Sequence, residues 1–208
     1  LKNHNFICLN YIFENKFDDI LFVNRVGLLC MFCEFDFFEL FKFFMAQDKI
    51  DVNHQVNRIE EKRDQIIIKT QSVIYYAIEK NNNEMIELIL SHPNISINQK
   101  NKIEKSIIKQ DIIDENLWNE YLLKEKLTIE NTVLNMELKR KNYEIVKLLL
   151  SRPEIDVNLV STIKNNNEIL DEKTALFLAV ENGNKEIIEL LLSRNVIDIN
   201  QVLKYSSI

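Results

Sequence analysis

The amino-acid sequence predicts an all-α fold, a helical solenoid in which short helix pairs stack and long hairpin loops join one pair to the next. Three observations support this prediction. A 27-residue string recurs, because Thr174 to Asn200 matches Thr132 to Asn158 at 13 positions and Ser72 to Asn98 at 12. Glycine and proline occur only twice each, which disfavours a fold with many tight turns. Apolar residues make up 46 % of the chain, enough for a packed core.

Each copy of the string has the features of two short helices. In the last copy, Thr174 can cap the first helix with its hydroxyl, and Leu176 and Ala179 follow at helical spacing. Gly183 can adopt the left-handed conformation that ends this helix, and Glu186 suits the start of the second. Two helices of about ten residues cannot bury their apolar sides alone, so we expect neighbouring pairs to stack.

The other copies keep this pattern with informative changes. Lys141 and Asn81 replace Gly183, and we expect strain at Lys141 because lysine, unlike asparagine, disfavours the left-handed conformation. Pro153 and Pro93 stand where the second helix must stop. Glu137 occupies a position between helices where alanine is expected, so this unit should be loosened or locally rearranged.

The recurring string resembles the ankyrin repeat. Thr174, Leu176 and Ala179 match part of the T-P-L-H-x-A signature, residues 144–150 match the second-helix E-I-V-x-L-L-L pattern, and residues 156–158 supply the D-V-N ending. The signature's proline and histidine are missing, being replaced by Ala175 and Phe177 in the last copy. The resemblance implies a protein-binding function and no cofactor.

The register of the repeats predicts the organisation of the whole chain. Most successive units are farther apart in the sequence than the length of one unit, because extra residues follow the asparagine that ends a unit. We expect these extra residues to lengthen the loops between units. The predicted units are a degenerate helical repeat or cap at 1–26, ankyrin-like repeats at 27–53, 72–98, 132–158 and 174–200, and an inserted helical loop at 99–131.

Two regions carry apolar residues with two possible roles. Eleven of the 12 phenylalanines lie within the first 45 residues, where they either form a self-buried core or rest against another surface. The predicted helix of the insert carries Trp118, the only tryptophan, which either anchors a partner or packs back on the stack.

Protein binding through the concave face and loops is the function that the resemblance implies. On that face, the charged or polar residues before each turn between helices are candidates, although such residues are often only solvated. The candidate binding residues are Glu79, Lys80, Trp118, Lys139, Arg140, Glu181 and Asn182.

Other classes of function find little support. The net charge of −6 disfavours nucleic acid, no stretch is suited to span a membrane, and no catalytic motif is present. Cys30 and Cys33 form a lone C-x-x-C, which indicates either two buried apolar residues or a weak metal or redox site. With only three cysteines we expect a reducing, cytoplasmic location. Because the chain begins with Leu1, an alternative is a non-catalytic targeting arm of a larger enzyme, such as a kinase or ubiquitin ligase.

Overall fold

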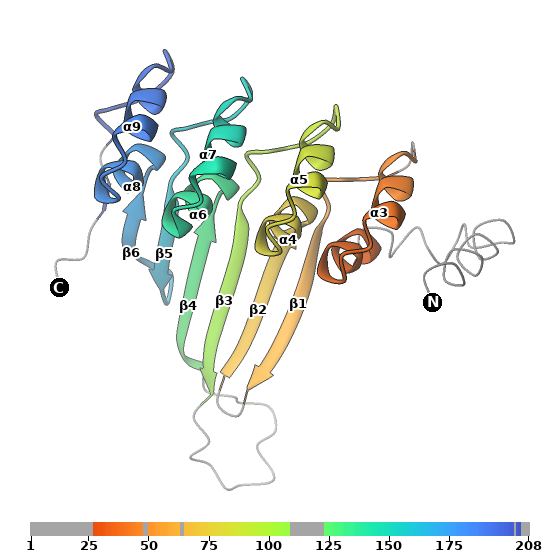
Figure 1. The fold of residues 1–208 in the computed structure, drawn as a ribbon. Helices are drawn as coiled ribbons and strands as arrows, with labels where there is room; N and C mark the ends of the chain where they lie inside the picture. Colours follow the sequence, from red (N-terminus) through yellow and green to blue (C-terminus); the bar gives the residue numbers. More distant parts are fainter. Residues whose placement is uncertain (1–26, 48–49, 63–64, 109–122, 202, 205–208) are drawn as a thin grey trace, which may run out of the picture.

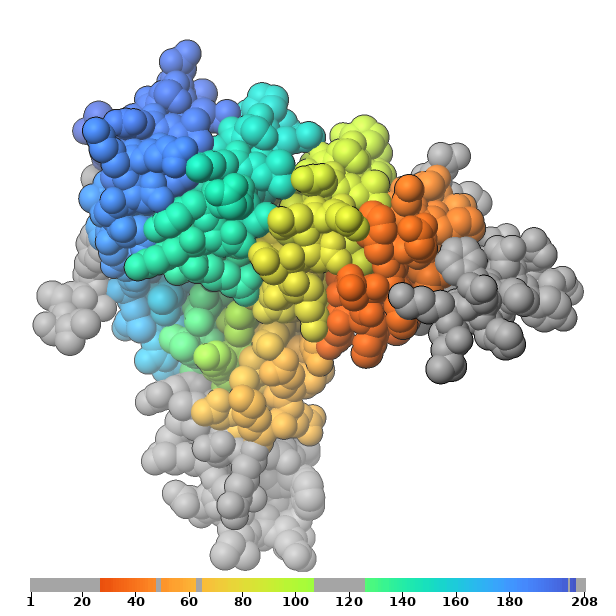
Figure 2. All heavy atoms as spheres, in the orientation of Figure 1, coloured from red at the N-terminus to blue at the C-terminus, as the bar shows by residue number. Residues whose placement is uncertain are grey.

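The helices of the protein come in pairs that stand side by side in chain order. The computed structural model describes residues 27–47, 50–62, 65–108, 123–201 and 203–204 (Figure 1). A helix at 27–34 pairs with α3 (Phe38–Met45), α4 (Val73–Glu79) with α5 (Asn83–Leu90), α6 (Val133–Arg140) with α7 (Tyr143–Leu150), and α8 (Ala175–Glu181) with α9 (Lys185–Leu192). Figure 2 shows the pairs as adjoining layers.

The segments between helix pairs form β-hairpins. Their strands are β1 (Gln55–Lys62), β2 (Gln65–Ser72), β3 (Asn101–Ile108), β4 (Leu123–Asn131), β5 (Ser161–Asn165) and β6 (Glu168–Lys173). Neighbouring hairpins also pair with each other, so the strands make one antiparallel sheet in chain order that hangs below the helices (Figure 1).

The prediction of an all-α fold was therefore wrong, and the protein combines helices with a six-stranded sheet. The long loops are hairpins, but they do not stand apart from one another. Packed helices lie about 8–10 Å apart, and two strands of a sheet occupy about the same width at about 4.8 Å each. A stack that adds one hairpin per helix pair therefore brings successive hairpins within hydrogen-bonding distance.

The described ends of the insert at 99–131 are strands, β3 and β4, rather than helix. The helix expected around Trp118 lies outside the described residues, as does the degenerate unit at 1–26. The β-branched residues of "KLTIEN" before α6 were the available signal for a strand.

The turn between the two helices of each pair has one left-handed residue. Asp36, Asn81, Lys141 and Gly183 have φ values of 57°, 52°, 59° and 67°. These residues occupy the same repeat position, so the left-handed turn expected from Gly183 occurs in every described pair. Lys141 adopts it without the freedom of glycine, as the sequence predicted.

The core lies where the helices of neighbouring pairs meet. Thr174 caps α8 as predicted, since its Oγ1 accepts a hydrogen bond from the Phe177 N–H at 3.1 Å. In the phenylalanine-rich segment, Phe32 and Phe41 are fully buried, whereas Phe35 is 60 % exposed. The described phenylalanines are thus divided between core and surface.

Candidate functional site

One face of the sheet turns toward the first helix of each pair, and we call it the inner face. Side chains on this face contact those helices in three places along the stack. These contacts are Arg58 Nη1 to Glu34 Oε1 (3.1 Å), Lys139 Nζ to Asn131 Oδ1 (2.8 Å) and Lys173 Nζ to Glu181 Oε1 (2.9 Å). These contacts join the inner face to the helix at 27–34, α6 and α8, so the inner face and the first helices of the pairs border a common surface (Figure 1).

A transverse row of side chains crosses all six strands on the inner face. Each member pairs with the next, in the order Arg58, Lys69, Ile103, Ile129, Ile163 and Asp171. The three central isoleucines are partly exposed. A second row, two residues nearer the hairpin tips, adds Leu127, which is partly exposed, and Ile67, which is buried. We call these five side chains the apolar patch: Ile67, Ile103, Leu127, Ile129 and Ile163.

On the opposite, outer face, ion pairs connect side chains of β3, β4 and β5. Glu104 Oε1 contacts Lys126 Nζ at 2.7 Å and Lys102 Nζ at 2.9 Å, and these ammonium groups lower the pKa of Glu104. Lys164 Nζ lies 3.4 Å from Glu130 Oε2. Isoleucines also occur on the outer face, such as the pair of Ile59 and Ile68 in the β1–β2 hairpin. The ion pairs are typical of a solvated face of an antiparallel sheet, unlike the apolar patch.

Two lysines beside the apolar patch make no ion pair within the described residues. Lys105 stands between Ile67 and Leu127 in the second row. Lys139 projects from α6 and is exposed, yet the surrounding protein withdraws enough solvent to lower the pKa of its amino group. The carboxylates of Asp171 and Glu181 act on this pKa in the opposite direction, without forming an ion pair with Lys139. The surface thus combines apolar side chains with two lysines that make no ion pair in the described structure.

Four of the residues predicted for binding make specific contacts within the protein. Arg140 Nη2 lies 3.7 Å from Glu79 Oε1, which joins α6 to α4. Glu181 holds Lys173, and the Asn182 side chain donates a hydrogen bond to the Leu138 carbonyl at 2.7 Å. Each of the four residues therefore connects neighbouring elements of the stack.

Of the other predicted residues, Lys80 and Lys139 lie on different helix pairs. Lys139 borders the apolar patch, Lys80 lies at the turn between α4 and α5, and Trp118 is outside the described residues. Sequence reasoning missed the apolar patch completely. The β-branched residues of "QIIIKT" and the alternation in "KLTIEN" were the signals for strands. The apolar rows, however, depend on which residues of neighbouring hairpins pair with each other.

Glu137 is a buried carboxylate at the centre of α6. Its side chain is 0 % exposed, and Arg140 Nη1 lies 3.1 Å from its Oε1. Its Oε2 has no hydrogen-bond partner in the described part of the chain, and burial raises the pKa of the carboxyl. The equivalent residues Ala77 and Ala179 are also fully buried. Glu137 therefore places a polar group in a layer that other repeats fill with alanine.

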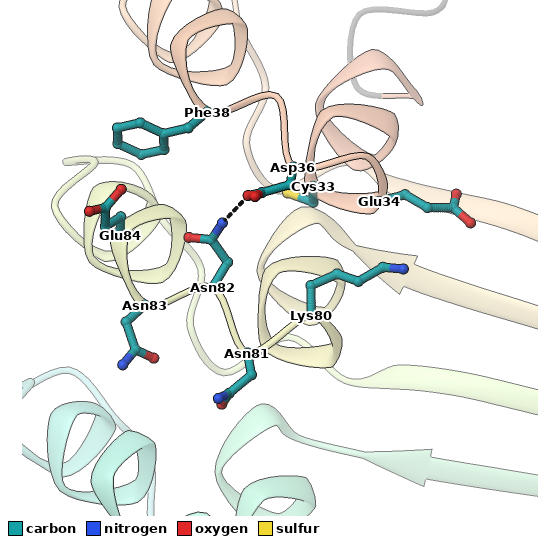
Figure 3. Close-up of a pocket in the computed structure, with 9 residues that line it drawn as sticks. All are labelled: Cys33, Glu34, Asp36, Phe38, Lys80, Asn81, Asn82, Asn83 and Glu84. Atoms are coloured by element: carbon teal, nitrogen blue, oxygen red, sulfur yellow. Dashed lines mark hydrogen bonds between the residues drawn. The ribbon is translucent and has the colours of Figure 1, made fainter.

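A pocket of about 560 Å³ lies between the turns of the first two described helix pairs (Figure 3). Asn82 Nδ2 donates a hydrogen bond to Asp36 Oδ1 at 2.6 Å across it. The lining residues are Cys33, Glu34, Asp36, Phe38, Lys80, Asn81, Asn82, Asn83 and Glu84. Asp36 and Asn82 tie one pair to the next, and the lining contains no paired nucleophile and base.

The described cysteines are structural in character. Cys30 and Cys33 are buried and free, and burial raises the pKa of Cys30 to about 12 and also raises that of Cys33. Both side chains are therefore protonated thiols at neutral pH. Among the described residues, no group of histidine, cysteine and acidic side chains has the arrangement of a metal site.

None of the helices in the described ranges has the length and apolarity needed to cross a membrane.

The fold and its inner face define a repeat protein built from stacked helix pairs and paired hairpins. The family model for ankyrin repeats (3 copies) matches residues 108–203. Residues 108–203 are therefore ankyrin repeats. Ankyrin repeats are generally modules of protein–protein interaction and are typically non-catalytic. Searches of curated proteins and of solved structures found no match.

Proposed function

We propose that the chain is a protein-binding scaffold whose partner docks on the inner face of the sheet and on the adjoining helices α4, α6 and α8. The observation that supports this most directly is the continuous row of Ile103, Ile129 and Ile163. These three apolar side chains are paired across neighbouring strands and are partly exposed to solvent. A partner that covers them displaces water from their surface, which favours binding in free energy.

The charges beside the patch specify the chemistry of the partner. Lys105 and Lys139 flank the apolar patch and make no ion pair in the described structure. A partner segment with apolar side chains and at least one carboxylate would satisfy both features. The already paired Arg140 and Glu181 would contribute less, because binding through them requires breaking contacts within the protein.

The rigidity of the surface favours binding. Each strand of the sheet is anchored by the helix pair that follows or precedes it, so little chain entropy is lost when a partner docks. The hairpins extend the surface well beyond the helices, which is how the long loops would contribute to recognition (Figure 1).

The experiment compares two sets of isoleucine-to-threonine substitutions, which keep β-branching and strand propensity. The inner-face variant carries Ile103→Thr, Ile129→Thr and Ile163→Thr. The control carries Ile59→Thr and Ile68→Thr on the outer face, where Ile59 is 61 % exposed. Proteins captured by the unmodified chain would be identified, and their dissociation constants measured with each folded variant.

We expect the inner-face variant to bind the partner at least about tenfold more weakly, from the loss of roughly 1.4 kcal/mol or more of apolar contact. The control should bind as the unmodified chain does. If the partner is retained by the inner-face variant and lost by the control, the outer face is the binding site and the proposal is wrong.

A further inference from the structure

A ladder of asparagines joins the repeats at the end opposite the hairpin tips. The asparagine that ends each unit uses both atoms of its side-chain amide on the backbone of the next unit. It donates to a carbonyl and accepts from the N–H two residues later. The rungs are Asn53 on Asn94 O and Ser96 N (2.6 and 2.6 Å), Asn98 on Glu154 O and Asp156 N (2.8 and 2.8 Å), and Asn158 on Val196 O and Asp198 N (2.7 and 2.8 Å).

Asn200 occupies the next rung of this ladder. Its N–H donates to Asp198 Oδ1 at 2.9 Å, as the Asn158 N–H donates to Asp156 Oδ1 at the same distance. The backbone of Asn200 is thus held like that of Asn158. Within the described chain, however, its side-chain amide has no hydrogen-bond partner, and the residue is exposed. The backbone of Asn200 is therefore in the position of a rung, but its side-chain amide has no partner in the described chain.

Three apolar positions beside Asn200 are uncovered in the same way. Val180, Leu192 and Ile199 are 57 %, 49 % and 65 % exposed. At the equivalent positions of the earlier units, the side chains are also apolar but are covered by the following unit. These are Cys33, Ile78 and Leu138 (1, 2 and 0 % exposed), Met45, Leu90 and Leu150 (7, 2 and 3 %), and Val52, Ile97 and Val157 (1, 2 and 0 %).

The path of the chain after Asn200 also follows the repeat. The Glu172 N–H donates to the Lys204 carbonyl at 3.0 Å, which sets Lys204 beside β6. The equivalent residues one unit earlier, Glu130 and Thr162, are partners in the β4–β5 ladder. Lys204 therefore lies where the first strand of another hairpin would run.

We propose that this C-terminal face, defined by Val180, Leu192, Ile199 and Asn200, is the docking surface of one further ankyrin-type repeat that continues the stack in the chain direction. A terminal unit that faces solvent is expected to carry polar residues there. An apolar surface alone would accept many occupants. The open rung selects one that presents a carbonyl and an N–H two residues apart, as the turn after each second helix does.

The inference does not depend on the inner face, because its test uses no binding partner. In the test chain, residues 201–208 are replaced by a second copy of residues 159–200. Leu159 of this copy then follows Asn200 in the sequence, as Leu159 follows Asn158 in the unmodified chain. Thermal unfolding of this extended chain is compared with that of the unmodified chain. Asn200→Ala is made in both chains, and Asn98→Ala in the unmodified chain serves as the reference for an occupied rung.

We expect the extension to raise the unfolding midpoint by on the order of 5 °C. Asn200→Ala should leave the midpoint of the unmodified chain unchanged but lower that of the extended chain by about 2–4 °C, as Asn98→Ala does at its own rung. This dependence on the extension would show that the rung is occupied.

Two results would overturn the proposal. One is an appended copy that stays unfolded or melts separately while residues 1–200 keep their own transition. The other is an unmodified chain that is dimeric by light scattering and becomes monomeric with Val180→Lys, because the face would then belong to a second copy of the chain.

Discussion

Leu150 and Leu192 offer a direct measure of what stacking contributes to stability. They end α7 and α9 at the same repeat position, and both belong to a run of three leucines. Leu150 is covered by the next unit and is 3 % exposed, whereas Leu192 is 49 % exposed. The two substitutions Leu150→Ala and Leu192→Ala therefore remove the same atoms from the same helix position with and without a covering layer.

The expected costs follow from this difference in burial. Truncating Leu150 removes buried carbons and leaves a cavity between units, which costs about 3 kcal/mol of unfolding free energy. Leu192 has lost only about half of its surface to the protein and leaves no enclosed cavity, so its truncation should cost about 1 kcal/mol. The gap of about 2 kcal/mol corresponds to roughly 6 °C in the unfolding midpoint of a chain of this length.

Urea unfolding followed by far-ultraviolet circular dichroism would measure both costs, with the slope of each curve testing whether the array still unfolds as one unit. Equal losses for the two variants, or a larger loss for Leu192→Ala, would refute the reasoning. In that case the unit that follows α7 would not be what buries Leu150.

Three further predictions concern single residues. Lys141→Gly should raise the unfolding free energy by about 0.5–1 kcal/mol, because glycine adopts φ near 60° without strain; an unchanged or lower urea midpoint would contradict this. Glu137→Gln should stabilise the protein by about 1 kcal/mol at pH 7. Because folding raises the pKa of Glu137, ionisation opposes folding, so this advantage should shrink as the pH falls toward 4.5, and a gain that persists at low pH would argue against the buried charge. In a Cys8→Ser background, Cys30 and Cys33 should react with a thiol reagent only after urea unfolding, and rapid labelling of the native protein would show that they are accessible.

The candidate site could be predicted only in part. The sequence pointed to the first helices and the loops as the binding surface, and Lys139 does border the apolar patch. Arg140 was grouped with it because the two are neighbours in the chain, yet Arg140 lies 3.1 Å from the buried Glu137 and over the ring of Tyr75 at 5.9 Å. Adjacent residues on a helix point in different directions, and the partners that give each one a role come from other units.

The local features of each unit were determined by the sequence itself. Helix caps such as Thr174, the left-handed turn at Gly183 and its counterparts, and the buried helix faces all depend on residues a few positions apart. The physical chemistry of a helix operates over that range through capping, backbone sterics and a period of 3.6 residues. A string that recurs with these features can therefore be recognised as a repeat, including the strained Lys141.

The sheet was decided only by the tertiary structure. Ile103, Ile129 and Ile163 form a row because the helix pairs stack at the width of two strands, so that each hairpin meets the next in one register. The same holds for Leu150 and Leu192, which have the same sequence context and differ only in whether a neighbour covers them. Hydrogen bonds between hairpins and burial between units are set by the distance between layers, and no short stretch of sequence encodes that distance.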